Sequence, residues 1–100
     1  MDYLPLFAEL KQRPVLVIGG GEIAERKIKF LLRAQAQVQV VAETLSPALA
    51  DLAARQALSW RATEFSDSLV DDVFLVIAAT EDEALNQRVF AVANARYRLV

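Results

Sequence analysis

Several residue types are missing from this chain, and each absence removes a class of function. The 100 residues contain no cysteine and no histidine. Disulfide bonds, zinc thiolate sites, a cysteine nucleophile and the usual imidazole base or metal ligand are therefore excluded within this chain. The carboxylates are numerous, but their positions are typical of exposed turns and first helical turns. We therefore expect neither a metal site nor a catalytic residue within these 100 positions.

The chain also lacks an excess of positive charge and a long hydrophobic run. Its net charge is −2, so nothing indicates a nucleic acid or an anionic membrane as a partner. No apolar run reaches the ~18 residues that a transmembrane helix needs. The start of the chain, Met1 to Pro5, has no basic region before an apolar stretch and does not resemble a signal peptide. Together with the absence of cysteine, these features favour a cytoplasmic protein.

Glycine is scarce, and all three glycines are consecutive, from Gly19 to Gly21. The apolar run Val15–Ile18 predicts a strand before them, and an amphipathic pattern predicts a helix directly after them. Read from Gly19 to Ala24, the spacing G-x-G-x-x-A is that of the dinucleotide-binding turn. Gly19 would allow the tight turn, Gly21 the approach of a pyrophosphate, and the helix N-terminus would attract phosphate charge. The same pattern also fits a purely structural turn, although its strand-and-helix context favours binding.

The next two elements continue the pattern of a nucleotide-binding unit. We expect a helix over Glu22–Ala34 and a second strand over Gln37–Ala42. Glu43 follows that strand, where an acidic residue commonly binds the ribose hydroxyls of the cofactor. A carboxylate there favours NAD over NADP. Glu43 also fits an exposed loop residue, so both interpretations stay open.

The middle of the chain predicts a second helix and a third strand. Ser46 followed by proline is typical of a helix start, and the apolar stripe continues to about Gln56. Leu58–Thr63 fits a short strand, and Phe65–Val70 fits a loop or a short helix. Before the glycines, Leu4–Glu9 fits either a short strand or a helical turn.

An almost continuous apolar run, Val73–Ala79, predicts a central parallel strand. Thr80 and Glu83 have the spacing of a capping box for a helix over about Glu81–Arg96. Thr80 would also lie at the carboxyl end of a strand, beside the predicted cofactor crevice. It can act as the helix cap, as a crevice residue, or as both.

The last four residues, Tyr97–Val100, begin another strand and then stop. We therefore expect residues 1–100 to be one domain and a fragment of a longer protein. The predicted fold class is α/β, with a Rossmann-like, doubly wound parallel sheet that binds NAD(P) and is truncated at its C-terminal end.

Three segments together resemble a known family. They are L-P-L-F at residues 4–7, V-L-V-I-G-G-G-E-I-A-E-R-K at residues 15–27, and A-A-T-E-D-E-A-L-N-Q-R-V at residues 78–89. They are similar to the N-terminal domain of siroheme synthase, the module with precorrin-2 dehydrogenase and sirohydrochlorin ferrochelatase activities. The similarity extends over essentially the whole chain. The second and third segments together are specific for this family, whereas either segment alone would be weak evidence for it.

The resemblance implies an activity for the full-length protein. NAD would accept hydride as precorrin-2 is oxidised to sirohydrochlorin, and the same module would insert ferrous iron to give siroheme. Members of the family form homodimers, and many are fused to a uroporphyrinogen-III methyltransferase. The acid–base aspartate of the family would fall just past Val100, outside this chain. We therefore expect this segment alone to bind NAD at best and to catalyse neither step.

The glycine pattern and the resemblance together predict the cofactor contacts. The resemblance contributes three sets of contacts: the pair after the first strand, the pair after the second strand, and the threonine after the late apolar strand. These are Glu22 and Ile23, Glu43 and Thr44, and Thr80. The resemblance also matches Asn86 to a family asparagine, without assigning it a role. The residues predicted to contact NAD are Gly19, Gly20, Gly21, Glu22, Ile23, Glu43, Thr44 and Thr80.

Two alternative functions remain open from the sequence. The first is an NAD-sensing regulatory domain of a transport system, such as those attached to potassium transporters, which binds NAD without turning it over. The A-A-T-x-D…N segment and the L-P-L-F lead favour the enzyme over this sensor. The second is a domain that keeps the fold but has lost its ligand, which the intact glycine turn argues against.

Overall fold

The structure, a computed structural model, describes residues 10–96. The strand or helical turn predicted at Leu4–Glu9 and the strand predicted to begin at Tyr97–Val100 lie outside these residues. Strands and helices alternate along the described chain, as a parallel α/β fold requires. The elements are β1 (Pro14–Ile18), α2 (Glu22–Arg33), β2 (Gln37–Val41), α3 (Pro47–Ala54), β3 (Ser59–Ala62), a 3₁₀ turn η1 (Asp67–Val70), β4 (Leu75–Ala78) and α4 (Glu83–Ala95).

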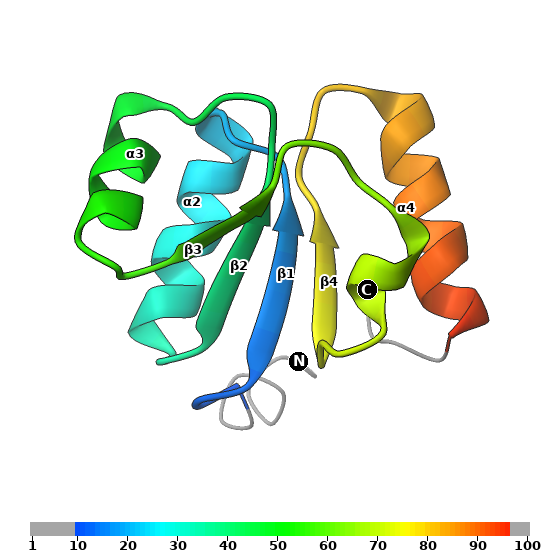
Figure 1. The fold of residues 1–100 in the computed structure, drawn as a ribbon, viewed down its shortest axis with the longest axis horizontal. Coiled ribbons are helices and arrows are strands. Elements are labelled where there is room, and N and C mark those ends of the chain that lie inside the picture. The colour runs from blue at the N-terminus through cyan, green and yellow to red at the C-terminus, as the bar shows by residue number, and fades with distance from the viewer. Residues whose placement is uncertain (1–9, 97–100) are drawn as a thin grey trace.

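The four strands form one parallel sheet in the order β3-β2-β1-β4. All carboxyl ends therefore meet at one edge of the sheet, where the loops after β1, β2 and β4 lie together (Figure 1). The strand predicted as central is β4, and within residues 10–96 it lies at the edge of the sheet. A continuous apolar run reports burial of both faces of a strand, and it carries no information on whether both edges are paired.

Helices cover both faces of the sheet, which confirms the doubly wound arrangement (Figure 1). Alternate residues of β1 point to opposite faces. Val15 and Val17 pack in the cluster that includes Ile28 of α2 and Leu49 of α3. Leu16 and Ile18 pack in a second cluster, with Val70, Val89 and Ala93 of η1 and α4. Burial of both faces explains the hydrophobic fraction of 55%.

The starts of α3 and α4 test two predictions about helix caps. Ser46 caps α3 as expected, because its Oγ accepts a hydrogen bond of 3.3 Å from the Leu49 N–H. The capping box predicted at Thr80 and Glu83 is wrong. Asp82 is the N-cap of α4, and its carboxylate accepts from the Leu85 N–H at 3.2 Å. Thr80 does not cap the helix, because its hydroxyl donates a hydrogen bond to the side chain of Asn86.

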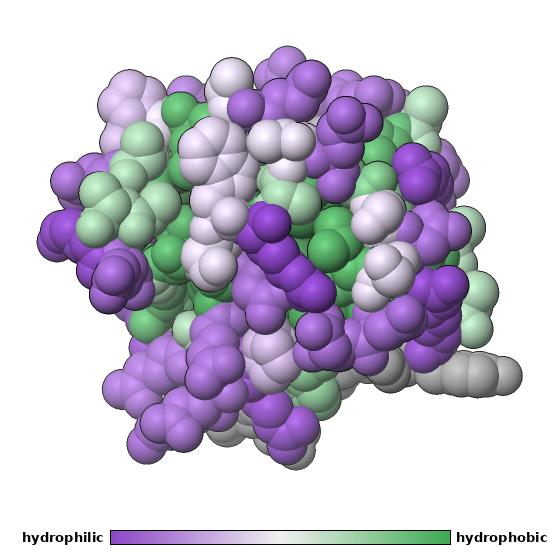
Figure 2. Space-filling view, in the orientation of Figure 1, coloured by the Kyte–Doolittle hydropathy of each residue, from purple (hydrophilic) through white to green (hydrophobic). Residues whose placement is uncertain are grey.

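Most of the face seen in Figure 2 is covered by hydrophilic side chains, with hydrophobic residues visible between them. Among the helices of residues 10–96, none combines the length and the hydrophobicity that crossing a bilayer requires. The apolar residues of the described chain instead gather in the two clusters that flank the sheet.

Candidate functional site

The glycine turn after β1 is held tightly between two neighbouring strands. Gly19 has φ +139°, a conformation that residues with a Cβ rarely adopt, and a Cβ there would lie 2.2 Å from the carbonyl oxygen of Ala79. A Cβ on Gly20 would lie 2.1 Å from the carbonyl oxygen of Thr44. Two of the three glycines are therefore required by contacts within the protein itself.

Gly21 differs from the other two glycines, because a Cβ on it would meet nothing within 4 Å. It is the N-cap residue of α2, and no side chain caps this helix end. The first N–H groups of α2 therefore have no capping side chain among the described residues, and the positive end of the helix dipole lies beside the space at Gly21. This end of α2 has the geometry of an anion-binding site that a bulkier residue at position 21 would fill.

A cavity of about 820 Å³ opens at this edge of the sheet, between the glycine turn and the ends of β2, β3 and β4. Its size is in the range of small-molecule and cofactor sites. All of the residues predicted to contact the cofactor line this cavity: Gly19, Gly20, Gly21, Glu22, Ile23, Glu43, Thr44 and Thr80. The fold thus brings together residues that lie more than 50 positions apart in the sequence.

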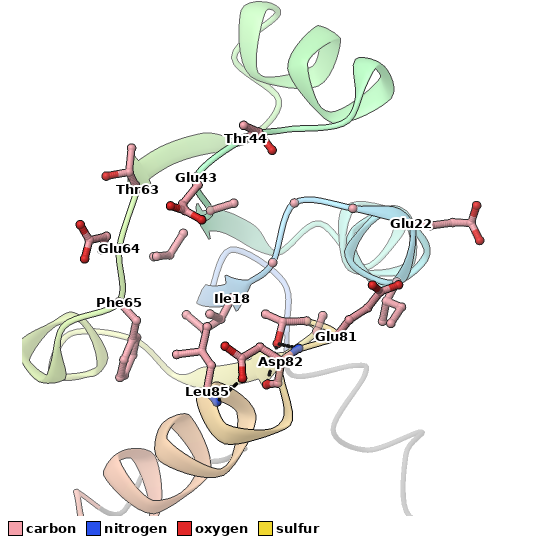
Figure 3. Close-up of a pocket in the computed structure, with 18 of the residues that line it drawn as sticks. Ile18, Glu22, Glu43, Thr44, Thr63, Glu64, Phe65, Glu81, Asp82 and Leu85 are labelled. Carbon is pink, nitrogen blue, oxygen red and sulfur yellow. Dashed lines mark hydrogen bonds between the residues drawn. The ribbon is translucent and has the colours of Figure 1, made fainter.

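Figure 3 shows how the charged side chains lie around this cavity. The carboxylate of Glu22 points away from the centre of the cavity, on the outer side of α2. Residue 22 therefore presents its backbone N–H, rather than its side chain, to a ligand at the helix N-terminus. Glu43 extends from the loop after β2 toward the interior of the cavity, and Glu64 lies on the neighbouring wall.

Several residues of the cavity wall were not among the sequence predictions. Thr63, Glu64 and Phe65 follow β3, whereas Leu85 and Arg88 belong to α4. The rule that parallel strands end at one edge could have indicated the loop after β3. No local signal marks Leu85 or Arg88, because a helical pattern does not reveal which turn of the helix faces the crevice.

The cavity is strongly acidic. Among residues 10–96, five lining residues are acidic and only Arg88 is basic: the acids are Glu22, Glu43, Glu64, Glu81 and Asp82. Arg88 is itself engaged on the wall, because its Nη2 lies 3.1 Å from Asp67 Oδ1 and its guanidinium stacks 5.1 Å from the Phe65 ring centre. Negative charge on a ligand must therefore be bound by the helix N-terminus and backbone rather than by a cluster of cations.

Thr80 lies where β4 ends, and its polar groups bond within its own turn. Its hydroxyl donates to Asn86 Oδ1 at 2.7 Å and accepts from the Asp82 N–H at 3.1 Å. Asn86 Nδ2 in turn donates to the Thr80 carbonyl at 3.0 Å. The hydroxyl proton is used inside the protein, so a ligand in the cavity meets Thr80 only as a hydrogen-bond acceptor or as an apolar surface.

A parallel sheet with strand order 3-2-1-4, a glycine turn at the end of β1 and a cavity over the strand ends define a dinucleotide-binding domain of the Rossmann class. Within that class, the chain belongs to the family described as "Putative NAD(P)-binding", whose model matches residues 6–100. This match confirms the predicted fold class and supports the predicted NAD cofactor.

Curated relatives are similar over the whole chain. A siroheme synthase of Klebsiella pneumoniae is 98% identical over 100 residues, and one of Cronobacter sakazakii is 64% identical over 100 residues. Each match covers 100% of this chain but 21% of the relative, so the chain spans about a fifth of the length of these proteins. A solved structure named SirC, precorrin-2 dehydrogenase, is 38% identical, with a TM-score of 0.77 over 82% of this chain and 41% of that one.

These matches confirm the resemblance to siroheme synthase on which the sequence analysis relied. They do not favour the transport-associated sensor, because the proteins matched here are named as enzymes of siroheme synthesis. The glycine turn is intact and opens onto a cavity, which also argues against a domain that has lost its ligand.

Proposed function

We propose that this chain is the NAD-binding domain of an enzyme of siroheme biosynthesis. The observation that carries the proposal is the open position at Gly21, where no atom lies within 4 Å of a Cβ placed at the uncapped end of α2. The remaining glycines are explained by internal packing, whereas the space at Gly21 has no structural use within residues 10–96. A dinucleotide pyrophosphate fits such a position by charge and by backbone approach.

The cavity offers each part of NAD a suitable surface. The pyrophosphate would accept hydrogen bonds from the first N–H groups of α2, near Gly21 and Glu22. Glu43 would accept hydrogen bonds from the ribose hydroxyls, and the loop at Thr44 would border the same sugar. Phe65 and Leu85 add apolar surface to the same cavity, as a nucleobase requires. We assign the predicted contacts Gly19, Gly20, Gly21, Glu22, Ile23, Glu43, Thr44 and Thr80 to this cofactor.

The preference for NAD over NADP follows from charge. NADP carries a phosphate on the ribose oxygen that Glu43 would contact, and Glu64 lies on the adjoining wall. Two carboxylates would repel that phosphate. Within residues 10–96, the single cation of the cavity wall, Arg88, is already paired with Asp67. The site therefore fits a ribose with free hydroxyls.

In the complete protein, we propose that NAD accepts a hydride removed from precorrin-2. The substrate loses a hydride and a proton, which gives sirohydrochlorin, NADH and H⁺. Ferrous iron then replaces two protons of sirohydrochlorin to give siroheme. The role of this chain is to hold the dinucleotide by its phosphates and ribose. We propose that the catalytic aspartate, the metal insertion and any methyltransferase domain belong to sequence outside residues 1–100.

We further propose that the complete protein is a cytoplasmic homodimer without a membrane or nucleic acid partner. The absence of cysteine in this chain supports the cytoplasmic location, and its net charge of −2 supports the lack of a nucleic acid or anionic membrane partner. The homodimer rests on the family resemblance.

Titration calorimetry of the complete gene product with NAD and with NADP tests the cofactor proposal. We expect saturable binding of NAD and at least tenfold weaker binding of NADP. Gly21→Val should abolish the NAD signal, because its side chain fills the phosphate position. A second assay would mix the protein, NAD and precorrin-2 and follow the absorbance of NADH. Equal affinity for both cofactors, or binding that survives Gly21→Val, would contradict the proposed site, and NAD binding without NADH formation would contradict the dehydrogenase.

A further inference from the structure

The side chain of Asn86 makes two hydrogen bonds to the same residue, Thr80, from the first turns of α4. It accepts from the Thr80 hydroxyl at 2.7 Å and donates to the Thr80 carbonyl at 3.0 Å. Both groups are half-buried, which makes such bonds costly to lose. An amide is the side chain that can accept and donate at adjacent atoms in this way. A carboxylate lacks the donor, and an aliphatic residue lacks both.

The pair fixes the turn between β4 and α4, which forms one wall of the cavity. The Asp82 N–H also bonds to the Thr80 hydroxyl, at 3.1 Å. On the other side of Thr80, the Ala79 N–H bonds to the Ile18 carbonyl at 2.8 Å, and the Ala79 carbonyl oxygen lies where a Cβ of Gly19 would clash. The turn is therefore packed directly against the glycine turn, and a shift of Thr80 would move both walls of the cofactor crevice.

Asn86 itself does not line the cofactor cavity. Thr80, Glu81 and Asp82 do, whereas Asn86 faces a separate surface hollow beside β4, together with Gln87 and Phe90. Any influence of Asn86 on the cofactor must therefore act through Thr80.

We propose that Asn86 is a positioning residue, which sets the NAD affinity of a cavity that it does not touch by holding Thr80 against the glycine turn. The inference rests on the proposed NAD-binding function. It assigns a role to an asparagine whose contribution the sequence alone left undefined. It also explains why Thr80 is not the helix cap, because its hydroxyl is committed to Asn86 and to the Asp82 N–H.

The test measures NAD affinity by calorimetry and the melting temperature in the complete gene product. Asn86→Ala removes both bonds to Thr80 and should weaken NAD binding about tenfold. Thr80→Val keeps the shape but removes the hydroxyl, with a similar expected loss. Because Thr80→Val keeps the bond from Asn86 Nδ2 to the Thr80 carbonyl, the loss of affinity in the double variant should be smaller than the sum of the two single losses if Asn86 acts through Thr80. Should Asn86→Ala fail to fold, Asn86→Asp, which keeps the acceptor oxygen, provides the same test.

Two controls separate positioning from general destabilisation. Gln87→Ala removes an exposed amide on the same helix and should change neither affinity nor melting temperature. Val89→Ala creates a cavity in the buried core of α4, and it should lower the melting temperature while NAD affinity at low temperature stays unchanged. A loss of NAD affinity in Val89→Ala equal to that in Asn86→Ala would overturn the inference.

The outcomes also separate this inference from the proposed function. A wild-type protein that binds NAD, with an Asn86→Ala variant of unchanged affinity, overturns the positioning role and leaves the cofactor site standing. A wild-type protein that does not bind NAD overturns the proposed function and this inference with it. Fully additive losses in the double variant would show that Asn86 acts independently of Thr80, which also contradicts the proposal.

Discussion

At the scale of single residues, the three consecutive glycines differ in what surrounds them. Gly19 and Gly20 pack against backbone carbonyls of Ala79 and Thr44, whereas Gly21 borders open space. The first two are therefore constrained by the fold, whereas the third is constrained only by the cofactor that we propose to bind there. This difference makes the glycine turn a place where stability and binding can be changed separately.

Alanine substitution should lower stability at Gly20 and NAD affinity at Gly21. Gly20→Ala places a methyl group against the Thr44 carbonyl and should lower the free energy of unfolding by ~2 kcal/mol or more. Gly21→Ala meets no protein atom and should change stability by less than ~0.5 kcal/mol, but it should weaken NAD binding at least ~10-fold. Urea unfolding and NAD titration of both variants measure the two effects, and similar stability losses would contradict the assignment.

Glu43 should contribute to cofactor choice through its charge. Glu43→Gln keeps the length of the side chain but replaces charge-assisted hydrogen bonds to the ribose by neutral ones, so NAD affinity should fall by roughly tenfold. Binding of NADP should be less affected or improve, because a repulsive charge is removed. The dissociation constant for NADP divided by that for NAD, both measured by calorimetry, should therefore decrease. An unchanged ratio would place Glu43 in the exposed loop role that the sequence also allowed.

At the scale of elements, α2 and α3 both end in a backbone conformation that glycine usually adopts. Both helices end in a left-handed residue, but that residue is glutamine, with φ +64° at Gln35 and φ +62° at Gln56. The accompanying hydrogen bonds run from the Ala36 N–H to the Leu31 carbonyl and from the Ala57 N–H to the Leu52 carbonyl, at 3.1 and 2.9 Å. These are the bonds of a Schellman motif, in which glycine is the usual residue.

Replacing either glutamine by glycine should stabilise the domain. Gln56→Gly relieves the strain of a Cβ in the left-handed region, partly offset by the greater entropy of glycine in the unfolded chain, for a net gain of ~0.5–1 kcal/mol. Gln56→Ala keeps the Cβ and serves as the matched control, with no gain expected. Thermal or urea unfolding measures the difference between the two variants. A Gln56→Gly protein no more stable than Gln56→Ala would show that the helix end is not strained.

At the scale of the whole molecule, the acidity of the cavity should govern how salt affects cofactor binding. Among the described residues, four acids other than the outward-pointing Glu22 line the cavity with one arginine, so an anionic ligand approaches against a repulsive field. Added salt screens this repulsion, so the affinity for NAD should rise modestly with ionic strength. The effect should be steeper for NADP, which carries an additional phosphate. Titrations of both cofactors over a salt series measure the two slopes, and a falling NAD affinity would indicate attraction rather than repulsion.

Much of the fold was accessible from local patterns. The strand at Val15–Ile18, the helix after the glycines and the Ser46 cap were predicted because each depends on residues close in sequence. The edge position of β4 within residues 10–96 was not predicted, since strand order depends on partners that hydropathy does not report. The sequence pattern placed the cap of α4 at Thr80, but the cap is Asp82. The prediction failed because the Thr80 hydroxyl bonds to the Asn86 side chain, which the capping pattern does not include.

By itself, the sequence determined the alternation of strands and helices, the two-faced burial of the sheet and the glycine turn after β1. These features follow from hydrophobic periodicity and from the backbone freedom of glycine, which act over a few residues. Only the tertiary structure decided that Phe65, Leu85 and Arg88 join the cavity, that Gly20 packs against the Thr44 carbonyl, and that Asn86 holds Thr80. The physical reason is that these relations depend on where separate elements pack, and that packing is set by contacts across the whole sheet.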